Sequence, residues 1–460
     1  MNNGVSRRDF LGGVGAAAGM MASRGFAMSS RKRGELLNVG VIGIGGKGWS
    51  DWHGLLDTKR CRIVAMCDTN RDWIDRAKEE VKDAKFYTDY RKMFDEVKGL
   101  DIVSVSTPDH THARAAIEAM KRGANVYVQK PLVRTLWEAE YFKKTARENR
   151  VVTQMGNQGS STDGMRRGVE ILRSGILGKV REVHVWTNRP EIEPGCKWGW
   201  HQPLFRPKDS DPVPPNLDWD CWIGTAPFRP YKKSIYEPIE WRAWYDFGTG
   251  AFGDMACHTM NLPFRGLELG RVISGEAVEI TPPYPETYPL WSKVRITCES
   301  AGGKKPNVDI YWYDGYRKPV AEIIPQVINT MGKIPATGCV VLGDNGILCS
   351  TNDYGEQSYI ALKGEEKMKG QDQHPACKDI PVTLPRVHSK HYDEFVAACF
   401  GETKAFSDID NSIPLVEAMQ VGCLAQRVSG KISWDAEKCV TDNEEANKLI
   451  KPFIRPGWEF

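Results

Sequence analysis

The sequence predicts two domains: an N-terminal α/β domain built on a doubly wound parallel sheet, and a C-terminal α+β domain with a largely antiparallel sheet. Two observations predict this division. Strand and helix patterns alternate between residues 38 and 154, whereas after residue 156 strands follow one another without intervening helices. A chain of 460 residues is also too long for one ordinary core.

In the first domain, short apolar runs predict strands and amphipathic stretches predict the helices between them. The strands are expected at Val39–Ile42, Arg62–Cys67, Ile102–Ser106, Asn125–Val128 and Val151–Gln154. The helices are expected at Trp49–Leu56, Asp72–Val81, Ala113–Lys121 and Leu136–Asn149. Strands separated by helices of about 10–15 residues form right-handed crossovers, so the sheet should be parallel and covered on both faces.

The second domain begins with one helix and one strand, and a long loop rich in proline and tryptophan follows them. These segments are Met165–Arg173, Val180–Thr187 and Asn188–Pro238. Later strands are expected at Arg271–Glu279, Ser292–Cys298, Asn307–Trp312, Ala321–Ile324, Gly338–Leu342 and Gly346–Ser350, and helices at His388–Cys399 and Ile413–Val428. The predicted domains are therefore residues 36–156 and 157–440, with a C-terminal tail at 441–460.

The first thirty residues are typical of an export leader. Ser6-Arg7-Arg8-Asp9-Phe10-Leu11 is a twin-arginine pattern, a weakly apolar run extends to Ala22, and Ala27 ends a small-residue cleavage site. The alternative is a basic disordered N-terminus. We expect a Tat signal peptide at residues 1–30 and a periplasmic or otherwise exported protein.

Composition and cysteine spacing exclude several classes of function. A net charge of +3 gives no electrostatic reason to expect nucleic acid as a partner. Outside the leader, no stretch approaches the roughly 20 apolar residues that span a bilayer. The twelve cysteines show no CxxC or Cys/His zinc spacing, so we expect no metal site. Because Tat cargo folds in the reducing cytoplasm, we expect free thiols, as at Cys61 and Cys67.

A glycine-rich turn predicts where the first domain binds its ligand. Val39–Ile42 runs into the G-x-G-x-x-G turn formed by Gly43, Gly45 and Gly48, with Gly46 between them, and a predicted helix follows. Such a turn brings the backbone and the helix N-terminus to a dinucleotide pyrophosphate.

Asp68 closes the next predicted strand, twenty residues after Gly48. A carboxylate there accepts hydrogen bonds from the adenosine ribose and repels a 2′-phosphate, so NAD is favoured over NADP, although Arg71 lies nearby. The alternative for Asp68 is a helix cap or a turn residue.

Two further motifs follow later strands of this domain. They are Ser106-Thr107-Pro108-Asp109-His110-Thr111-His112 and Val126-Tyr127-Val128-Gln129-Lys130-Pro131. With the glycine turn, they resemble the Gfo/Idh/MocA oxidoreductases over nearly the whole chain after the leader. The resemblance implies a Rossmann domain and a second domain whose sheet covers the nicotinamide.

The resemblance also implies roles for individual residues. Lys130 would lie beside the nicotinamide and the reacting hydroxyl, where an ammonium can stabilise developing negative charge on oxygen. Thr107, Pro108 and His112 would line the cofactor, with His112 also starting a helix. The family usually has glutamate where this chain has Gln129.

The second domain carries the motif Gly248-Thr249-Gly250-Ala251-Phe252-Gly253-Asp254-Met255-Ala256-Cys257-His258. It resembles the family's glycine turn and following helix, although the family often has glycine at Ala256. Asp254 and His258 are four residues apart and share one helical face. His258 can accept the hydroxyl proton as hydride leaves, and Asp254 can orient a substrate hydroxyl or tune the histidine.

Tryptophan is concentrated between residues 186 and 244. Trp219 and Trp222 are expected in the core, whereas Trp200 and His201 are candidates for a wall against a sugar. Arg242 is a candidate for binding a substrate hydroxyl or acidic group.

Three functions follow from these residues. The first is NAD-dependent hydride transfer at a hydroxyl of a carbohydrate or cyclitol, in which an exported protein keeps and recycles its NAD. The second is an NAD-dependent glycosidase that acts by transient oxidation, elimination and re-reduction. The third is a non-catalytic sugar-binding protein that retains the fold. The resemblance also implies a homo-oligomer.

Overall fold

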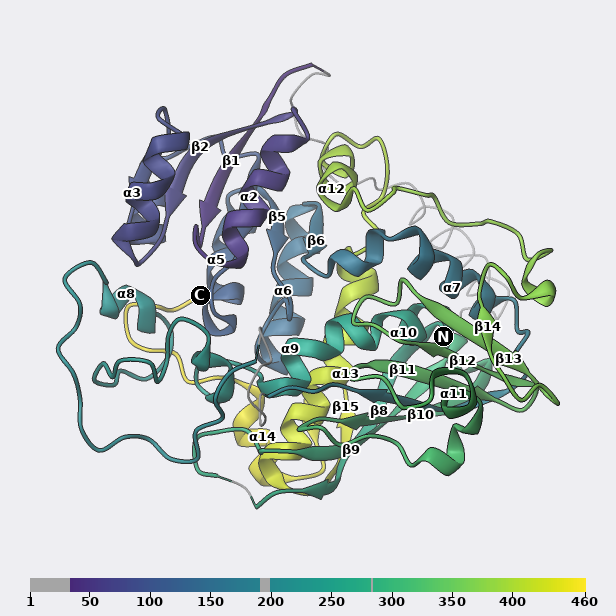
Figure 1. Ribbon diagram of the computed structural model, residues 1–460. Helices are drawn as coiled ribbons and strands as arrows, with labels where there is room; N and C mark the ends of the chain where they lie inside the picture. The colour runs from purple at the N-terminus through teal and green to yellow at the C-terminus, as the bar shows by residue number, and fades with distance from the viewer. Residues whose placement is uncertain (1–33, 191–198, 283) are drawn as a thin grey trace, which may run out of the picture.

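A computed structural model describes residues 34–190, 199–282 and 284–460 of the chain. The predicted export leader lies outside these residues. The described residues form two domains, each centred on one sheet, and Figure 1 shows the first in purple and blue beside the green sheet of the second.

The first sheet is parallel, as predicted, and has six strands in the order β3-β2-β1-β4-β5-β6. The strands are β1 (Leu37–Ile42), β2 (Cys61–Cys67), β3 (Lys85–Tyr87), β4 (Ile102–Val105), β5 (Asn125–Val128) and β6 (Thr153–Met155). The helices between them are α2 (Lys47–Asp57), α3 (Arg71–Glu80), α4 (Tyr90–Glu96), α5 (Asp109–Lys121) and α6 (Leu136–Asn149).

Local sequence explains where these helices begin. Asn70 accepts a hydrogen bond from the Asp72 backbone and starts α3, and Thr135 with Glu138 forms a capping box at the start of α6. The strand order reverses between β1 and β4, and the ends of β1, β4 and β5 are level because Ile42 pairs with Val105 and Val105 with Val128. Ligands of doubly wound sheets bind at this edge.

The second sheet has ten strands in the order β14-β13-β12-β11-β7-β10-β9-β8-β15-β16. Only the β7–β10 pair is parallel, which confirms the predicted largely antiparallel sheet. The strands are β7 (Val180–Trp186), β8 (Leu269–Ile280), β9 (Ser292–Ser300), β10 (Lys305–Tyr313), β11 (Gly338–Gly343), β12 (Gly346–Ser350), β13 (Ser358–Leu362), β14 (Lys369–Gly370), β15 (Lys431–Asp435) and β16 (Val440–Thr441).

Eight α-helices belong to the described part of the chain after β6. They are α7 (Asp163–Arg173), α8 (Trp219–Ile223), α9 (Gly250–Thr259), α10 (Asn261–Gly266), α11 (Pro325–Met331), α12 (His391–Cys399), α13 (Ile409–Val428) and α14 (Glu444–Ile450). The central helix is α13, which contacts the second sheet, α9 and α6 of the first domain.

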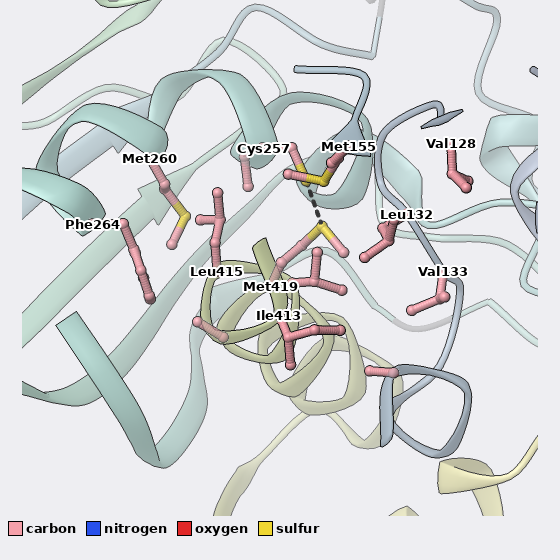
Figure 2. Close-up of a cluster of buried hydrophobic side chains, with 14 of the residues drawn as sticks. Val128, Leu132, Val133, Met155, Cys257, Met260, Phe264, Ile413, Leu415 and Met419 are labelled. Carbon is pink, nitrogen blue, oxygen red and sulfur yellow. Dashed lines mark hydrogen bonds between the residues drawn. The ribbon is translucent and has the colours of Figure 1, made fainter. Parts of the chain in front are cut away.

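The two domains share one apolar core around α13. Figure 2 shows side chains of β5 and β6, of the turn after β5, of α9 and α10, and of α13 meeting there: Val128, Met155, Leu132, Val133, Cys257, Met260, Phe264, Ile413, Leu415 and Met419. The Cys257 thiol donates a hydrogen bond to the Met419 sulfur at 3.7 Å. Because Cys257 is anchored in this core, the position of its neighbour His258 is set by the docking of the domains.

Helix α12 completes the first domain although it comes late in the chain. Phe395, Val396 and Cys399 are buried in the same cluster as Leu37 of β1 and Trp52 of α2. Figure 1 shows α12, in yellow-green, beside the purple α2. The hydrophobic core of the first domain therefore includes side chains from outside its predicted bounds, residues 36–156.

The structure differs from the sequence predictions at several elements. The predicted strand at Ala321–Ile324 is wrong, because residues Ala321–Ile323 form a single 3-10 turn that leads into α11. The predictions also missed β3 and α4 of the first domain and β13, β14, β15, β16, α8, α10 and α11 of the second. Residues 441–460, expected as a tail, begin with α14.

Several classes of feature are not found within the described ranges. No helix there is both long and apolar enough to cross a membrane. No cluster of three or more His, Cys, Asp and Glu side chains there is arranged to hold a metal ion. Cys61 and Cys67 are buried free thiols.

Candidate active site

The glycine turn connects β1 to α2 at the edge where the strand order reverses. Gly43 has φ of 86°, and a Cβ there would lie 2.5 Å from the Ser106 carbonyl oxygen. A Cβ at Gly48 would lie 2.0 Å from the Gly43 carbonyl oxygen. Side chains at these two positions are therefore excluded, and the turn stays tight.

The residues present fit a dinucleotide. Helix α2 has eleven residues, and no side chain caps its N-terminus, where the Gly48 N–H donates to the Gly45 carbonyl within the turn. The positive end of the helix therefore faces the position of an anion. The Asp68 carboxylate lies against the turn, accepting hydrogen bonds from the backbone nitrogens of Ile44 at 2.7 Å and Gly45 at 3.1 Å. Burial raises the pKa of Asp68, and these hydrogen bonds oppose that rise.

A segment of the second domain crosses beside Asp68. Residues 214–218, here called the strap, pair with the loop between β2 and α3: the Arg71 nitrogen donates to the Asn216 carbonyl, and the Asp218 nitrogen to the Thr69 carbonyl, both at 2.8 Å. Leu217 and Asn70 form an antiparallel bridge. The loop expected to bind the adenosine ribose is therefore held by the second domain.

Residues 451–460, here called the tail segment, bind α8, the short helix that directly follows the strap. Arg455 donates to the Gly224 carbonyl at 3.0 Å and forms an ion pair with Asp220 at 2.5 Å. The Arg91 guanidinium stacks on the Trp458 ring at 3.8 Å and donates to the Gly457 carbonyl. In Figure 1 this yellow segment runs past α8. It connects the strap region to α4 of the first domain.

A charged cluster forms where the end of β5 meets α9. The Lys130 ammonium lies 2.5 Å from Oδ1 of Asp254 and 2.8 Å from the Asp254 carbonyl oxygen. Arg242 donates from Nε to the same Oδ1 at 2.9 Å. Burial opposes ionisation of Asp254, but the charges of Lys130 and Arg242 outweigh it and hold its pKa well below its usual range. Asp254 is therefore an anion shared by two cations.

His258 lies one helical turn beyond Asp254, as its spacing predicts. Its ring contacts Tyr354 edge to face at a centroid distance of 5.1 Å. Burial, followed by the charge of Lys130, lowers the pKa of His258 to about 3. Its Nδ1 is buried and has no hydrogen-bond partner among the described residues. The imidazole is therefore neutral, and its buried, unpaired nitrogen fits a site that binds a polar group there.

The motif after β4 contributes mainly to structure. His112 makes a 2.7 Å hydrogen bond between Nε2 and the Thr107 carbonyl, and Pro108 precedes the first turn of α5. Sequence reasoning missed Asp109, whose carboxylate accepts a hydrogen bond from Thr249 at 2.7 Å. Burial raises the pKa of Asp109 to about 7. Asp109 therefore joins the start of α5 to the start of α9.

The tryptophan-rich loop forms its own core. Trp200 is 1% exposed and donates to Gln202 within this cluster, so the structure does not place it on a wall as expected. Trp219 and Trp222 are buried and stacked at 4.7 Å, as predicted. His201 is exposed, and Arg242 reaches the charged cluster.

The fold and this site define a protein that binds a dinucleotide through a Rossmann domain, and comparison with known proteins gives the family. Residues 37–157 match the NAD-binding Rossmann domain of the Gfo/Idh/MocA oxidoreductase family, and residues 166–275 match its C-terminal α/β domain. The chain belongs to the Gfo/Idh/MocA family. Its first domain is an NAD-binding domain, as the glycine turn predicts.

The sequence relatives are described as glycosidases. A glycosyl hydrolase family 109 protein from Solibacter usitatus is 36% identical over 154 residues, which are 29% of this chain and 35% of that protein. An α-N-acetylgalactosaminidase from Shewanella oneidensis is 26% identical over 205 residues, 38% of this chain and 44% of that protein. The matches thus span less than half of each relative.

Two solved structures with this fold are described as dehydrogenases. WlbA dehydrogenase from Chromobacterium violaceum, in complex with NADH and UDP-GlcNAcA, has a TM-score of 0.59 and 15% identity over 88% of this chain and 97% of that chain. A levoglucosan dehydrogenase with NADH and levoglucosan has a TM-score of 0.58 and 13% identity over 87% of this chain and 99% of that chain. At these identities the likeness extends to the fold alone.

The depressed pKa of His258 predicts a pH-dependent stability. Because the folded-state pKa of about 3 lies below the unfolded value of 6.5, His258 stabilises the fold above pH 6.5, and this contribution is lost as the pH falls toward 3. Relative to wild type, His258→Gln should gain about 2 kcal/mol in free energy of unfolding between pH 7.5 and pH 5.

Denaturant unfolding at the two pH values measures this gain. The control is His201→Gln, whose exposed ring keeps its hydration on folding. A gain for His258→Gln no larger than that of the control would contradict a neutral buried imidazole.

Proposed function

We propose that this protein transfers hydride between NAD and a hydroxyl of a carbohydrate or cyclitol. The observation that carries the proposal is the cluster of Lys130, Asp254 and His258 at the edge of the NAD-binding sheet. NAD bound at the glycine turn supplies the hydride acceptor. The chain's own residues supply the charges and the proton acceptor.

Each residue has a distinct proposed role in this reaction. Lys130 orients the substrate hydroxyl and stabilises negative charge on its oxygen. His258 takes the hydroxyl proton because its imidazole is neutral at working pH. Asp254 keeps Lys130 and Arg242 in place, and it balances their charge in the absence of substrate.

We further propose that the protein retains its NAD through many turnovers, in which the bound cofactor oxidises the hydroxyl of one substrate and is returned to NAD by reducing the carbonyl of a second. The strap pairs with the loop after Asp68, and the tail segment holds the strap region. Free NAD is scarce outside the cytoplasm, and a protein exported in folded form through the predicted Tat leader can carry its cofactor with it.

A redox-neutral glycosidase is the second candidate, and the sequence relatives favour it. In this reaction, oxidation of one sugar hydroxyl to a ketone permits elimination of the aglycone, and water then adds to the resulting double bond. Reduction of the ketone restores the sugar hydroxyl and the oxidised cofactor. It requires the same residues and a retained NAD, and it differs from dehydrogenation in its net products.

One experiment distinguishes the candidates. Purified protein, without added NAD, is incubated with p-nitrophenyl α-N-acetylgalactosaminide and, separately, with free sugars and cyclitols. Release of nitrophenol over many turnovers without net NADH supports the glycosidase. Formation of up to one equivalent of bound NADH from a free sugar, with no nitrophenol released, supports the dehydrogenase. Neither activity, in a protein that also fails to bind NAD, would favour a non-catalytic sugar-binding protein.

Cofactor retention leads to a separate prediction. Arg455→Ala removes the ion pair and the hydrogen bonds that fix the strap region, so NAD should dissociate about tenfold faster, which corresponds to about 1.4 kcal/mol. The dissociation rate is measured by displacement with labelled NAD. The control is Arg271→Ala, which removes an exposed ion pair with Glu299 on the second sheet. Equal NAD release from both variants would contradict a retaining role for the tail segment.

A further inference from the structure

A fully buried carboxylate lies on α2, at the fifth residue of the helix that follows the glycine turn. The side chain of Asp51 is 0% exposed. It accepts hydrogen bonds from four side chains on different segments: Lys47 at 2.6 Å, Ser106 at 2.7 Å, Tyr392 at 2.8 Å and Gln129 at 2.9 Å. Both carboxylate oxygens are thus occupied by protein donors, which a buried anion requires.

Gln129 connects this carboxylate to the charged cluster. It is the residue before Lys130, and its amide nitrogen donates to both oxygens of Asp51, at 3.1 and 2.9 Å. Gly156 encloses the amide from another side, because a Cβ there would lie 2.6 Å from the amide nitrogen. The orientation of the Gln129 side chain, and of the backbone leading into Lys130, is therefore set by Asp51.

The negative charge of this contact lies on one partner only, because position 129 is glutamine. A glutamate at that position beside Asp51 would place two buried carboxylates about 3 Å apart, and they could not both ionise. In this chain the amide is on β5 and the single negative charge is on α2.

We propose that Asp51 is the positioning residue for Lys130 and the glycine-turn helix. The inference rests on the proposed function for its kinetic test. Asp51 joins α2, the end of β4, the end of β5 and α12, which are the segments that bring the cofactor turn and Lys130 together.

The proposal is tested by exchanging the charge between the two partners. In Asp51→Asn an amide replaces the acceptor of four donors, so kcat should fall about 10- to 100-fold, with KM for the sugar changed less than about threefold. In the double variant Asp51→Asn/Gln129→Glu the negative charge returns on β5, and kcat should recover to within about threefold of wild type. A double variant no more active than Asp51→Asn would overturn the proposal.

The single variant Gln129→Glu gives a readout that a purely structural role would not produce. Asp51 and the new glutamate would share one proton, and the protonated pair resembles the native pair of carboxylate and amide. Activity relative to wild type should therefore be highest at acidic pH and fall as the pH rises and the shared proton is lost. The other titratable groups facing the pair are Lys47, Tyr127 and Tyr392; burial and the charge of Asp51 raise the pKa of both tyrosines. A flat relative profile would contradict the inference.

Two controls separate this inference from the proposed function. Asp57→Asn, on the same helix but exposed, should leave kcat and NAD retention unchanged. Retention of NAD is measured on every variant, because it does not depend on the substrate. If wild-type protein turns over no sugar, the proposed function fails. The Asp51 inference is then tested by NAD retention alone. Asp51→Asn should lower NAD retention, and the double variant should restore it; no recovery in the double variant would contradict the inference.

Discussion

Lys130→Met is expected to lower kcat by about a thousandfold while the protein still retains NAD. The ammonium of Lys130 is held between Oδ1 and the carbonyl oxygen of Asp254, and methionine of similar length cannot replace its charge. Arg242 remains on Asp254, so the buried carboxylate keeps one cation and the helix should stay in place. Turnover and bound NAD are measured on the same preparation.

The matched control for this variant is Lys144→Met, because Lys144 is an exposed lysine on α6 of the same domain. It should keep wild-type activity and wild-type NAD content. Near-wild-type turnover in Lys130→Met would remove Lys130 from the reaction. Loss of NAD together with activity would assign it a binding role instead.

Glu394→Gln is expected to lower the free energy of unfolding by about 3–5 kcal/mol. Both oxygens of Glu394 accept hydrogen bonds from the buried Arg166 guanidinium, at 2.7 and 2.9 Å, and Arg265 stacks on Phe406 in the same cluster. Without the carboxylate, two buried guanidiniums remain close together with less compensating charge. The change is measured by denaturant unfolding.

The control for Glu394→Gln is Glu445→Gln, which removes an exposed ion pair with Lys448 on α14. This variant should change stability by less than about 0.5 kcal/mol. Similar losses for both variants would show that the Arg166–Glu394 pair contributes no more than a surface pair.

The parts of the molecule that the sequence predicts best depend on local rules. Gly43 and Gly48 are required by backbone geometry within one turn, and Asp68 lies next to them because it ends the neighbouring strand. Lys130 comes to the same edge because strands of a parallel sheet end together. These positions follow from spacing along the chain and from the topology of the sheet.

Other parts of the site depend on how distant segments dock. Asp254 and His258 share a helical face, but the contact of Asp254 with Lys130 exists only because α9 packs between the domains. Asp51 has no signal in the sequence, since one aspartate in an amphipathic helix is ordinarily solvated. Trp200 misled the prediction, because a loop dense in indole rings buries them against one another.

The placement of α12 has a consequence for synthesis of the protein. Its apolar side chains close the core that β1 and α2 begin, yet they are made only after nearly all of the second domain. While the chain emerges from the ribosome, that core stays open, and a fragment ending near residue 157 should expose apolar surface and aggregate. We therefore expect the core of the NAD-binding domain to be completed only after most of the second domain has been synthesised.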